Sequence, residues 1–337
     1  MKPLNVAVVG ATGLVGSQLL TVLKERDFPV GSLKLLASAR SVGMKMEFRG
    51  RQLEVLEARP DAFEGTDIAF FCAGTDISRE LAPYAVKAGA VVIDKSNAFR
   101  LDRDVPLVVP EVNPEALADH KGIVASPNCS TIQMVVALKP IHLLSRIERV
   151  IVSTYQAVTG TGKEAAEELR EQSEAVLAGK KRPPVVYPYQ IAFNLLPHID
   201  SFWDNGFTGE EMKMVLETKK ILRDDDIQVA ATTVRVPVFN CHSESVSVKT
   251  VRPLGALRVR QALASAPGVI VADEPTLSIY PMPIDASGRD EVFVGRIRDD
   301  LDDPTWVHFW LVADNVRKGA ATNAVQIAET MIQKGLL

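Results

Sequence analysis

A cysteine at the start of a predicted helix is the residue in this chain best suited to covalent chemistry. The segment PNCST at 127–131 follows a strand-like run and leads into the apolar segment 132–138, which predicts a helix beginning near Cys129. N–H groups and the dipole at a helix N-terminus stabilise a thiolate and can also receive an oxyanion. An isolated cysteine is more often a buried apolar residue. The polar neighbours and the helix-start position nevertheless favour a nucleophile at Cys129.

A histidine in a polar junction is the candidate general acid/base. His242 follows a strand-like segment that ends at residue 238, and it is the only one of the five histidines in such a place. A histidine in a turn is more often solvated or capping, so this signal alone is weak. Of the other cysteines, Cys72 lies in the apolar run IAFFCAG and Cys241 directly precedes His242. No two histidines have the spacing of metal ligands, so we expect no metal site.

A glycine-rich turn near the N-terminus indicates a nucleotide site. The sequence GATGLVG follows the first strand-like run and leads into a helical pattern, where glycines and a helix N-terminus can approach a pyrophosphate. Its spacing is G-x-x-G-x-x-G rather than G-x-G-x-x-G, so an ordinary strand-to-helix turn is the alternative. The residues expected to contact the cofactor here are Gly10, Thr12, Gly13, Leu14, Val15 and Gly16.

The end of the second strand-like run indicates which dinucleotide binds. NAD-binding domains place an acidic residue there, against the ribose hydroxyl. This chain has Ser38, Arg40 and Ser41 instead, with no carboxylate until Glu47. Serines and an arginine suit a 2′-phosphate, which favours NADP over NAD, although an arginine in an exposed loop is the alternative.

The elements that must position these residues follow two patterns. From residue 4 to about 126, short apolar runs alternate with helical patterns, as in a doubly wound α/β domain. After residue 145 the strands become longer and crossover helices fewer, which favours a mixed or antiparallel sheet. The strands expected in the first part are 4–9, 33–38, 68–73, 90–96, 107–112 and 122–128.

These patterns predict an α/β fold with two domains. The first is a Rossmann-type, doubly wound nucleotide domain made of residues 1–128 and 315–337, because the last helical pattern has an apolar face suited to packing on it. The second is a mixed-sheet α/β catalytic domain of residues 129–314, with a helical insertion at about 163–224.

Composition limits the partners. Charged residues make up 24% of the chain and the formal net charge is -4, so no basic excess attracts nucleic acid or anionic lipid. The N-terminus lacks the pattern of a signal peptide, and no apolar run is long enough to cross a bilayer. We therefore expect a cytoplasmic protein whose partners are small molecules and copies of itself.

Seven segments, in the same order, match one known family. They are GATGLVG at 10–16, SNAFR at 96–100, PNCST at 127–131, TYQAV at 154–158, EEMKMVLETKKIL at 210–222, RVPV at 235–238 before His242, and 315–329. On these segments the chain resembles the aspartate-semialdehyde dehydrogenases over nearly its whole length. The resemblance implies a Rossmann domain closed by the C-terminal helix and a catalytic domain that dimerises, in a homodimer or homotetramer.

The resemblance also implies a reaction. Family members interconvert L-aspartate 4-semialdehyde, inorganic phosphate and NADP⁺ with 4-phospho-L-aspartate and NADPH, in the biosynthesis of lysine, threonine and methionine. In the biosynthetic direction Cys129 would displace phosphate to give a thioester, which is reduced and collapses to the aldehyde. His242 would be the general acid, and Gln156 would position the thioester carbonyl or His242.

Substrate and cofactor contacts follow from the same resemblance. Arg235 would bind the α-carboxylate through a bidentate pair, and Glu210 would bind the α-ammonium group. Glu211 instead completes a T-x-x-E capping box with Thr208 and is expected to be structural. The residues implied for phosphate are Arg100, Asn128 and Lys213, and those implied for the cofactor beyond the glycine-rich turn are Thr75, Thr159, Gly160 and Asn315.

Three positions depart from the family pattern, and other functions compete. Cys241 stands where the family commonly has a small residue, Ser126 where asparagine is frequent, and Thr159 where serine is common. A second thiol at Cys241 raises the hypothesis of a site sensitive to peroxide.

N-acetylglutamyl-phosphate reductase is the nearest alternative enzyme, but its substrate has no ammonium group for Glu210. Glyceraldehyde-3-phosphate dehydrogenase is disfavoured by residues 38–41, and a non-catalytic, nucleotide-binding paralogue by the retained nucleophile and substrate arginines.

Overall fold

The computed structural model describes residues 3–337, which divide into two compact units. The first unit contains the described residues up to Asn128 together with Ala320–Leu337. The second unit is Cys129–Gly319. Within residues 3–337, no helix is long and apolar enough to span a membrane.

The first unit is built on a mainly parallel sheet. Over the described residues its strand order is β3-β4-β2-β1-β5-β6-β7, and only the β3–β4 pairing is antiparallel. Strand β2 lies on one side of β1 and β5 on the other, so the order in which strands are added to the sheet reverses at β1. Doubly wound folds bind ligands at the carboxyl ends of the strands at such a point. The elements are β1 Leu4–Val9, α1 Leu14–Glu25, β2 Val30–Ala37, β3 Lys45–Phe48, β4 Arg51–Glu57, β5 Ile68–Phe71, α2 Thr75–Lys87, β6 Val91–Asp94, β7 Ile123–Ala125 and α8 Thr322–Lys334.

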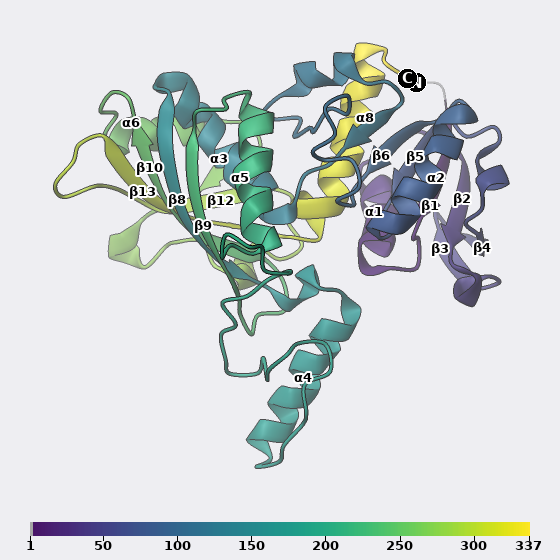
Figure 1. The fold of residues 1–337 in the computed structure, drawn as a ribbon, viewed down its shortest axis with the longest axis horizontal. Helices are drawn as coiled ribbons and strands as arrows, with labels where there is room; N and C mark the ends of the chain where they lie inside the picture. Colours follow the sequence, from purple (N-terminus) through teal and green to yellow (C-terminus); the bar gives the residue numbers. More distant parts are fainter. Residues whose placement is uncertain (1–2) are drawn as a thin grey trace. The chain divides into compact units, whose positions relative to one another are not determined.

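The C-terminal helix completes the core of the first unit. Ile327 and Met331 of α8 are fully buried with Val6 and Val8 of β1 and Leu19 of α1. This single apolar cluster therefore joins residues from the two ends of the chain. Figure 1 shows α8, in yellow, beside α1 and β6.

One predicted strand in the first unit is wrong. Residues 107–112 form no strand apart from a single bridge between Leu107 and Ala125. Pro110 has no N–H group to donate to a sheet. The side chain of Asn113 accepts a hydrogen bond from the Val109 N–H and donates to the Leu107 carbonyl, so a polar side chain takes the place of a strand partner.

The second unit is built on a mixed sheet, as predicted. In the described chain its order is β11-β12-β13-β10-β8-β9, with β8–β9 and β11–β12 parallel and the other pairs antiparallel. Figure 1 shows α3, α5 and α6 beside this sheet. The elements are α3 Cys129–Leu144, β8 Ile147–Gln156, α4 Lys163–Leu177, α5 Gly209–Leu222, β9 Gln228–Arg235, β10 His242–Thr250, α6 Ala256–Ala264, β11 Val269–Val271, α7 Pro283–Ala286, β12 Val292–Asp299 and β13 Trp306–Ala313.

The insertion between β8 and β9 contains two helices and a long irregular segment. Helix α4 lies away from the sheet, whereas α5 lies beside it (Figure 1). Two buried side chains of α4 satisfy backbone N–H groups of the irregular segment: Glu168 accepts from Val185 and Val186, and Gln172 accepts from Ile191. Helix α5 begins with the capping box predicted at Thr208, so Glu211 has a structural role.

Candidate active site

Cys129 and His242 lie in contact. Cys129 is the first residue of α3, and its Sγ is 3.2 Å from Nε2 of His242, the first residue of β10. The Ala157 N–H donates to Nδ1 of His242 over 3.0 Å. Because Nδ1 accepts that hydrogen bond, the neutral imidazole carries its proton on Nε2, directed at the sulfur. The buried histidine can therefore stabilise a Cys129 thiolate by donating a hydrogen bond to it.

A glycine in a π-helical turn makes room for the nucleophile. Arg317–Ala321 form this turn, and a Cβ added to Gly319 would lie 2.9 Å from Cβ of Cys129. Asp314 holds the turn, since its Oδ1 accepts from the N–H groups of Val316 and Arg317. π-Helical turns concentrate at functional sites. Sequence inspection missed this role, because Gly319 has no local signal for a contact 190 residues away.

We predict that Gly319→Ala lowers kcat. The added methyl must displace Cys129, and a misplacement of about 1 Å costs roughly 100-fold in rate. Steady-state kinetics and the rate of Cys129 alkylation by iodoacetamide check this expectation. Gly179→Ala is the control, because nothing lies within 4 Å of its added methyl, although its φ of 69° makes alanine strained. Equal kcat values for Gly319→Ala and wild type would contradict the prediction.

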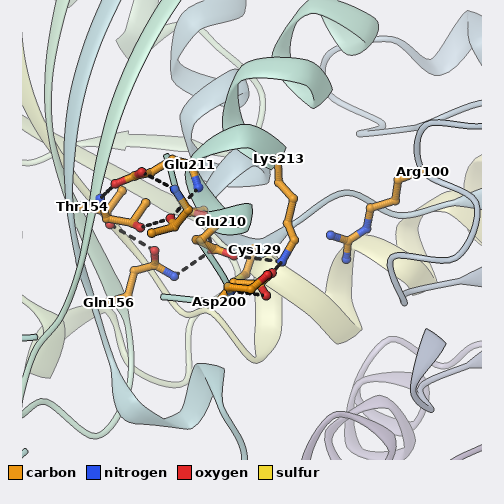
Figure 2. Close-up of polar contacts among 12 residues, drawn as sticks. Arg100, Cys129, Thr154, Gln156, Asp200, Glu210, Glu211 and Lys213 are labelled. Carbon is orange, nitrogen blue, oxygen red and sulfur yellow. Dashed lines mark hydrogen bonds and ion pairs between the residues drawn. The ribbon is translucent and has the colours of Figure 1, made fainter. Parts of the chain in front are cut away.

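Three residues implied by the family resemblance meet in one buried network. Gln156 Nε2 donates to Glu210 Oε1 over 3.0 Å, and Lys213 Nζ donates to Glu210 Oε2 over 3.2 Å (Figure 2). Ser130 Oγ also donates to Glu210, over 3.1 Å. Only 4% of Glu210 is exposed, so these contacts are needed to stabilise its charge.

Asp200 joins this network and was not predicted from the sequence. Its Oδ2 lies 2.7 Å from Lys213 Nζ. Burial raises the pKa of Asp200, but the hydrogen bond and the charge of Lys213 outweigh burial and leave that pKa below its ordinary value. Lys213 is thus held between two carboxylates, those of Asp200 and Glu210 (Figure 2).

Arg235 lies near His242 with part of its guanidinium available. It is the last residue of β9 and 5% exposed, and its Nη1 donates to the Ala157 carbonyl over 2.6 Å. Its buried Nε has no hydrogen-bond partner within residues 3–337. A Cβ added to Gly160 would lie 2.8 Å from Arg235 Nη1 and 3.3 Å from His242 Nε2, so a glycine at this position leaves room for both side chains. An unsatisfied buried N–H requires an acceptor, and a carboxylate supplies one.

Asn315 ties the segment before His242 to the loop before Gly160. Its Oδ1 accepts from the Cys241 N–H over 2.9 Å, and its Nδ2 donates to Thr159 Oγ1 over 3.1 Å. The structure therefore brings together Thr159, Gly160 and Asn315, the three cofactor residues implied within the second unit.

The environment of Cys241 opposes the hypothesis that it makes the site sensitive to peroxide. Burial, with a smaller contribution from the charge of Asp314, raises the pKa of the Cys241 thiol. Oxidation requires an accessible thiolate, and this thiol is completely buried. Cys241 also has a φ of 72°, a left-handed backbone conformation that favours glycine.

In the first unit, the glycine-rich turn leads into a helix start without a side-chain cap from residues 3–337. Gly10 has a φ of 80°, and a Cβ there would lie 2.8 Å from the Cys72 carbonyl oxygen. Gly13 is the N-cap of α1, and among the described residues no side chain caps that helix start, whose first turn has no acidic residue. Its N–H groups therefore suit the pyrophosphate of a dinucleotide.

The loop that follows β2 lies beside this turn. Thr12 Oγ1 and Ser41 Oγ are 3.4 Å apart, and Ser38 and Arg40 are exposed. The structure thus groups the residues predicted for pyrophosphate with those predicted for a 2′-phosphate. Thr75 begins α2, after β5 of the same sheet.

Two residues implied for phosphate binding belong to the first unit. Arg100 is 5% exposed and donates to the carbonyls of Ser126 and Lys95. Asn128 is buried and directly precedes Cys129. Ser126, which departs from the family pattern, has its hydroxyl 3.0 Å from the side-chain nitrogen of Asn323.

Comparisons with known proteins agree with this organisation. The family model of the semialdehyde dehydrogenase NAD binding domain matches residues 5–120, and that of the semialdehyde dehydrogenase dimerisation domain matches residues 138–318. Aspartate-semialdehyde dehydrogenases from Aquifex aeolicus and Bacillus subtilis are 56% and 53% identical to this chain. The alignments cover 99% of both chains for the first, and 100% of this chain and 99% of the relative for the second.

Solved structures are similar over the same length. Aspartate semialdehyde dehydrogenase II from Vibrio cholerae, complexed with ASA, is 48% identical with a TM-score of 0.96, and the match covers 99% of each chain. The Candida albicans aspartate semialdehyde dehydrogenase with NADP is 27% identical with a TM-score of 0.78, and the match covers 100% of each chain.

Proposed function

Because this chain belongs to the aspartate-semialdehyde dehydrogenase family, we propose that Cys129, His242 and Arg235 form the centre of its active site. The enzyme is an NADP-dependent, phosphorylating aldehyde dehydrogenase that reduces 4-phospho-L-aspartate to L-aspartate 4-semialdehyde. The reaction serves the biosynthesis of lysine, threonine and methionine. The observation that carries the assignment is the 3.2 Å contact between Cys129 Sγ and His242 Nε2.

Cys129 opens the reaction as the nucleophile. Its thiolate attacks the acyl carbon of 4-phospho-L-aspartate, a C–S bond forms, and the bond from that carbon to the phosphate oxygen breaks to release inorganic phosphate. N–H groups at the start of α3 can stabilise the oxyanion formed during the attack. The product is a thioester on Cys129, which divides one difficult step into two easier ones.

The cofactor fits the first unit. The uncapped start of α1 suits a pyrophosphate, and exposed Ser38 and Arg40 suit a 2′-phosphate. NADPH, when bound, supplies the hydride that reduces the thioester. The Nε2–H of His242 lies beside the sulfur and can donate a hydrogen bond to the oxyanion that hydride addition forms on the thioester carbon. When that oxyanion collapses, the C–S bond breaks, the aldehyde is released and the Cys129 thiolate is regenerated.

The charges of the second unit match those of the substrate. We assign the α-carboxylate to Arg235, whose buried Nε needs an acceptor, and the α-ammonium group to Glu210. Lys213 is the cation we assign to phosphate in this unit, held in place by Asp200 and Glu210. The phosphate-binding roles of Arg100 and Asn128, and the cofactor roles of Thr75, Thr159, Gly160 and Asn315, stay predictions.

The chain oligomerises, and we propose a homodimer formed through the second unit. Its match to a dimerisation domain supports oligomer formation. Buried and exposed residues alternate along much of β8, and Ile151 and Tyr155 are among the exposed ones. The ring of Tyr155 packs against that of Trp310 of β13, with the ring centroids 5.3 Å apart. Aromatic and aliphatic side chains on one sheet face are suited to pairing with a second copy. Assembly of such dimers into a homotetramer and a cytoplasmic location stay predictions.

Substrate preference tests the proposed function. We expect rapid NADPH oxidation with 4-phospho-L-aspartate and a kcat/KM at least about 100-fold lower with N-acetyl-L-glutamyl 5-phosphate, because the acetylated nitrogen of that substrate offers Glu210 no positive charge. Spectrophotometric rates at 340 nm with both acyl phosphates measure this. Glu210→Gln should reduce the preference, whereas a preference of wild type for the acetylated substrate would refute the assignment.

A further inference from the structure

A second contact joins the two elements that carry Cys129 and His242. Gln133 lies four residues after Cys129 on α3, and Glu244 lies two residues after His242 on β10, so both point to the same sides of their elements as the catalytic pair. Gln133 Nε2 donates to Glu244 Oε1 over 2.7 Å, and lies 3.4 Å from the His242 carbonyl oxygen. The Cys129–His242 and Gln133–Glu244 contacts are therefore successive links between α3 and β10.

The Gln133–Glu244 link is completely enclosed. Gln133 is 1% exposed and Glu244 is 0% exposed. Two of their atoms, Gln133 Oε1 and Glu244 Oε2, are buried with no hydrogen-bond partner in the described part of the chain. Both atoms are only acceptors when Glu244 is ionised, and leaving two buried acceptors unsatisfied is costly.

A proton on Glu244 resolves this arrangement. It converts the carboxyl into a donor, and the amide oxygen of Gln133 is an acceptor that lacks one within residues 3–337. The amide N–H of Gln133 already donates to the other carboxyl oxygen. Burial raises the pKa of Glu244 well above its ordinary value and outweighs the hydrogen bond from Gln133, which lowers that pKa; the nearby charge of Glu210 raises it further. Acid and amide can then satisfy each other as a neutral pair.

We propose that Glu244 is a positioning residue that acts as a neutral acid: with Gln133 it fixes the first turns of α3 against the start of β10, and so holds Cys129 in contact with His242. This inference rests on the proposed function, because it assigns those two residues to catalysis. Glu244 touches neither substrate nor cofactor in this scheme. Its effect reaches the reaction through the backbone of α3 and β10.

The neutral state also suits the charges around Glu244. Glu210 on α5 is already negative, and the site must accept a Cys129 thiolate and an anionic substrate. A second buried negative charge would repel all of them in a low-dielectric environment. A neutral acid retains the hydrogen bonds without adding that charge.

Variants of Gln133 and Glu244 distinguish a neutral Glu244 that positions Cys129 from a Glu244 that is ionised or that only stabilises the fold. Glu244→Gln keeps a neutral side chain of the same size and should retain kcat within about twofold. Glu244→Leu removes the hydrogen bonds and should lower kcat by about 10- to 100-fold with little change in KM, the result of a misplaced nucleophile. Gln133→Glu should also lower kcat, and the exchanged pair Gln133→Glu with Glu244→Gln should recover most of it.

The readouts are kcat and KM with 4-phospho-L-aspartate, and the rate at which iodoacetamide alkylates Cys129. Alkylation needs no substrate, so it still tests the position of Cys129 if the proposed substrate is wrong. Loss of kcat in Glu244→Gln would overturn the neutral-acid role, and so would an exchanged pair no better than Gln133→Glu. If Glu244→Leu does not fold, the Gln133→Glu and exchanged-pair variants decide the question without it.

Discussion

Cys129→Ala is expected to lose turnover by at least about 10⁴-fold, the scale found when a covalent nucleophile is removed. No other thiol can replace it. Burial raises the pKa of Cys72 to about 12, and Cys241 is buried with its pKa also raised. The remaining cysteines are therefore protonated and inert at neutral pH. Phosphate-dependent reduction of NADP⁺ and NADPH oxidation with 4-phospho-L-aspartate measure the loss in both directions.

Two controls sharpen this test. Cys72→Ala should retain kcat, because Cys72 lies in the first unit and takes no part in the proposed chemistry. In wild type incubated with 4-phospho-L-aspartate and no NADPH, mass spectrometry should find an acyl group on Cys129, and none in Cys129→Ala. Substantial activity in Cys129→Ala would disprove the covalent mechanism.

Arg235→Lys should lower kcat/KM by about 10²- to 10³-fold although the positive charge is kept. Lysine cannot form a bidentate pair with the α-carboxylate, and it cannot reproduce both that pair and the present bond to the Ala157 carbonyl. Removing one partner from a buried charged pair costs about 2–5 kcal/mol. Most of the loss should be in KM for 4-phospho-L-aspartate, since the carboxylate is bound before and during the reaction.

The matched control for this substitution is Arg258→Lys, at an exposed position on α6. It should leave kcat and KM unchanged. Arg235→Leu removes the positive charge as well as the bidentate geometry, so its kcat/KM should be lower than that of Arg235→Lys. If Arg235→Lys behaved like wild type, the carboxylate would have to be bound elsewhere.

The fold was largely predictable because the two kinds of sheet differ in their hydrophobic patterns. Continuous apolar runs indicated the parallel sheet of the first unit, and longer strands with few crossovers indicated the mixed sheet of the second. Strands β3 and β4 were not predicted, because their exposed charged residues hide the apolar pattern. The strand predicted at 107–112 failed because the side chain of Asn113 took the hydrogen bonds that a neighbouring strand would have made.

Residues with local signals could be predicted, and residues defined by distant contacts could not. Cys129 was recognisable from the helix start that follows it, and His242 from the polar junction around it. Gln133 and Glu244 are 111 positions apart in the sequence. The residues around each of them give no sign that the two side chains form a hydrogen bond. Their relation depends on how α3 packs against β10, which only the three-dimensional structure defines.

The place of α8 in the core of the first unit has a consequence for biogenesis. This unit begins with β1, yet Ile327 and Met331 complete its apolar core. A ribosome makes the whole second unit before those residues appear. The nascent chain must therefore carry an unfinished core, with exposed apolar strands, through most of its synthesis. Such a chain would depend on chaperones during translation more than one whose domains are continuous in sequence.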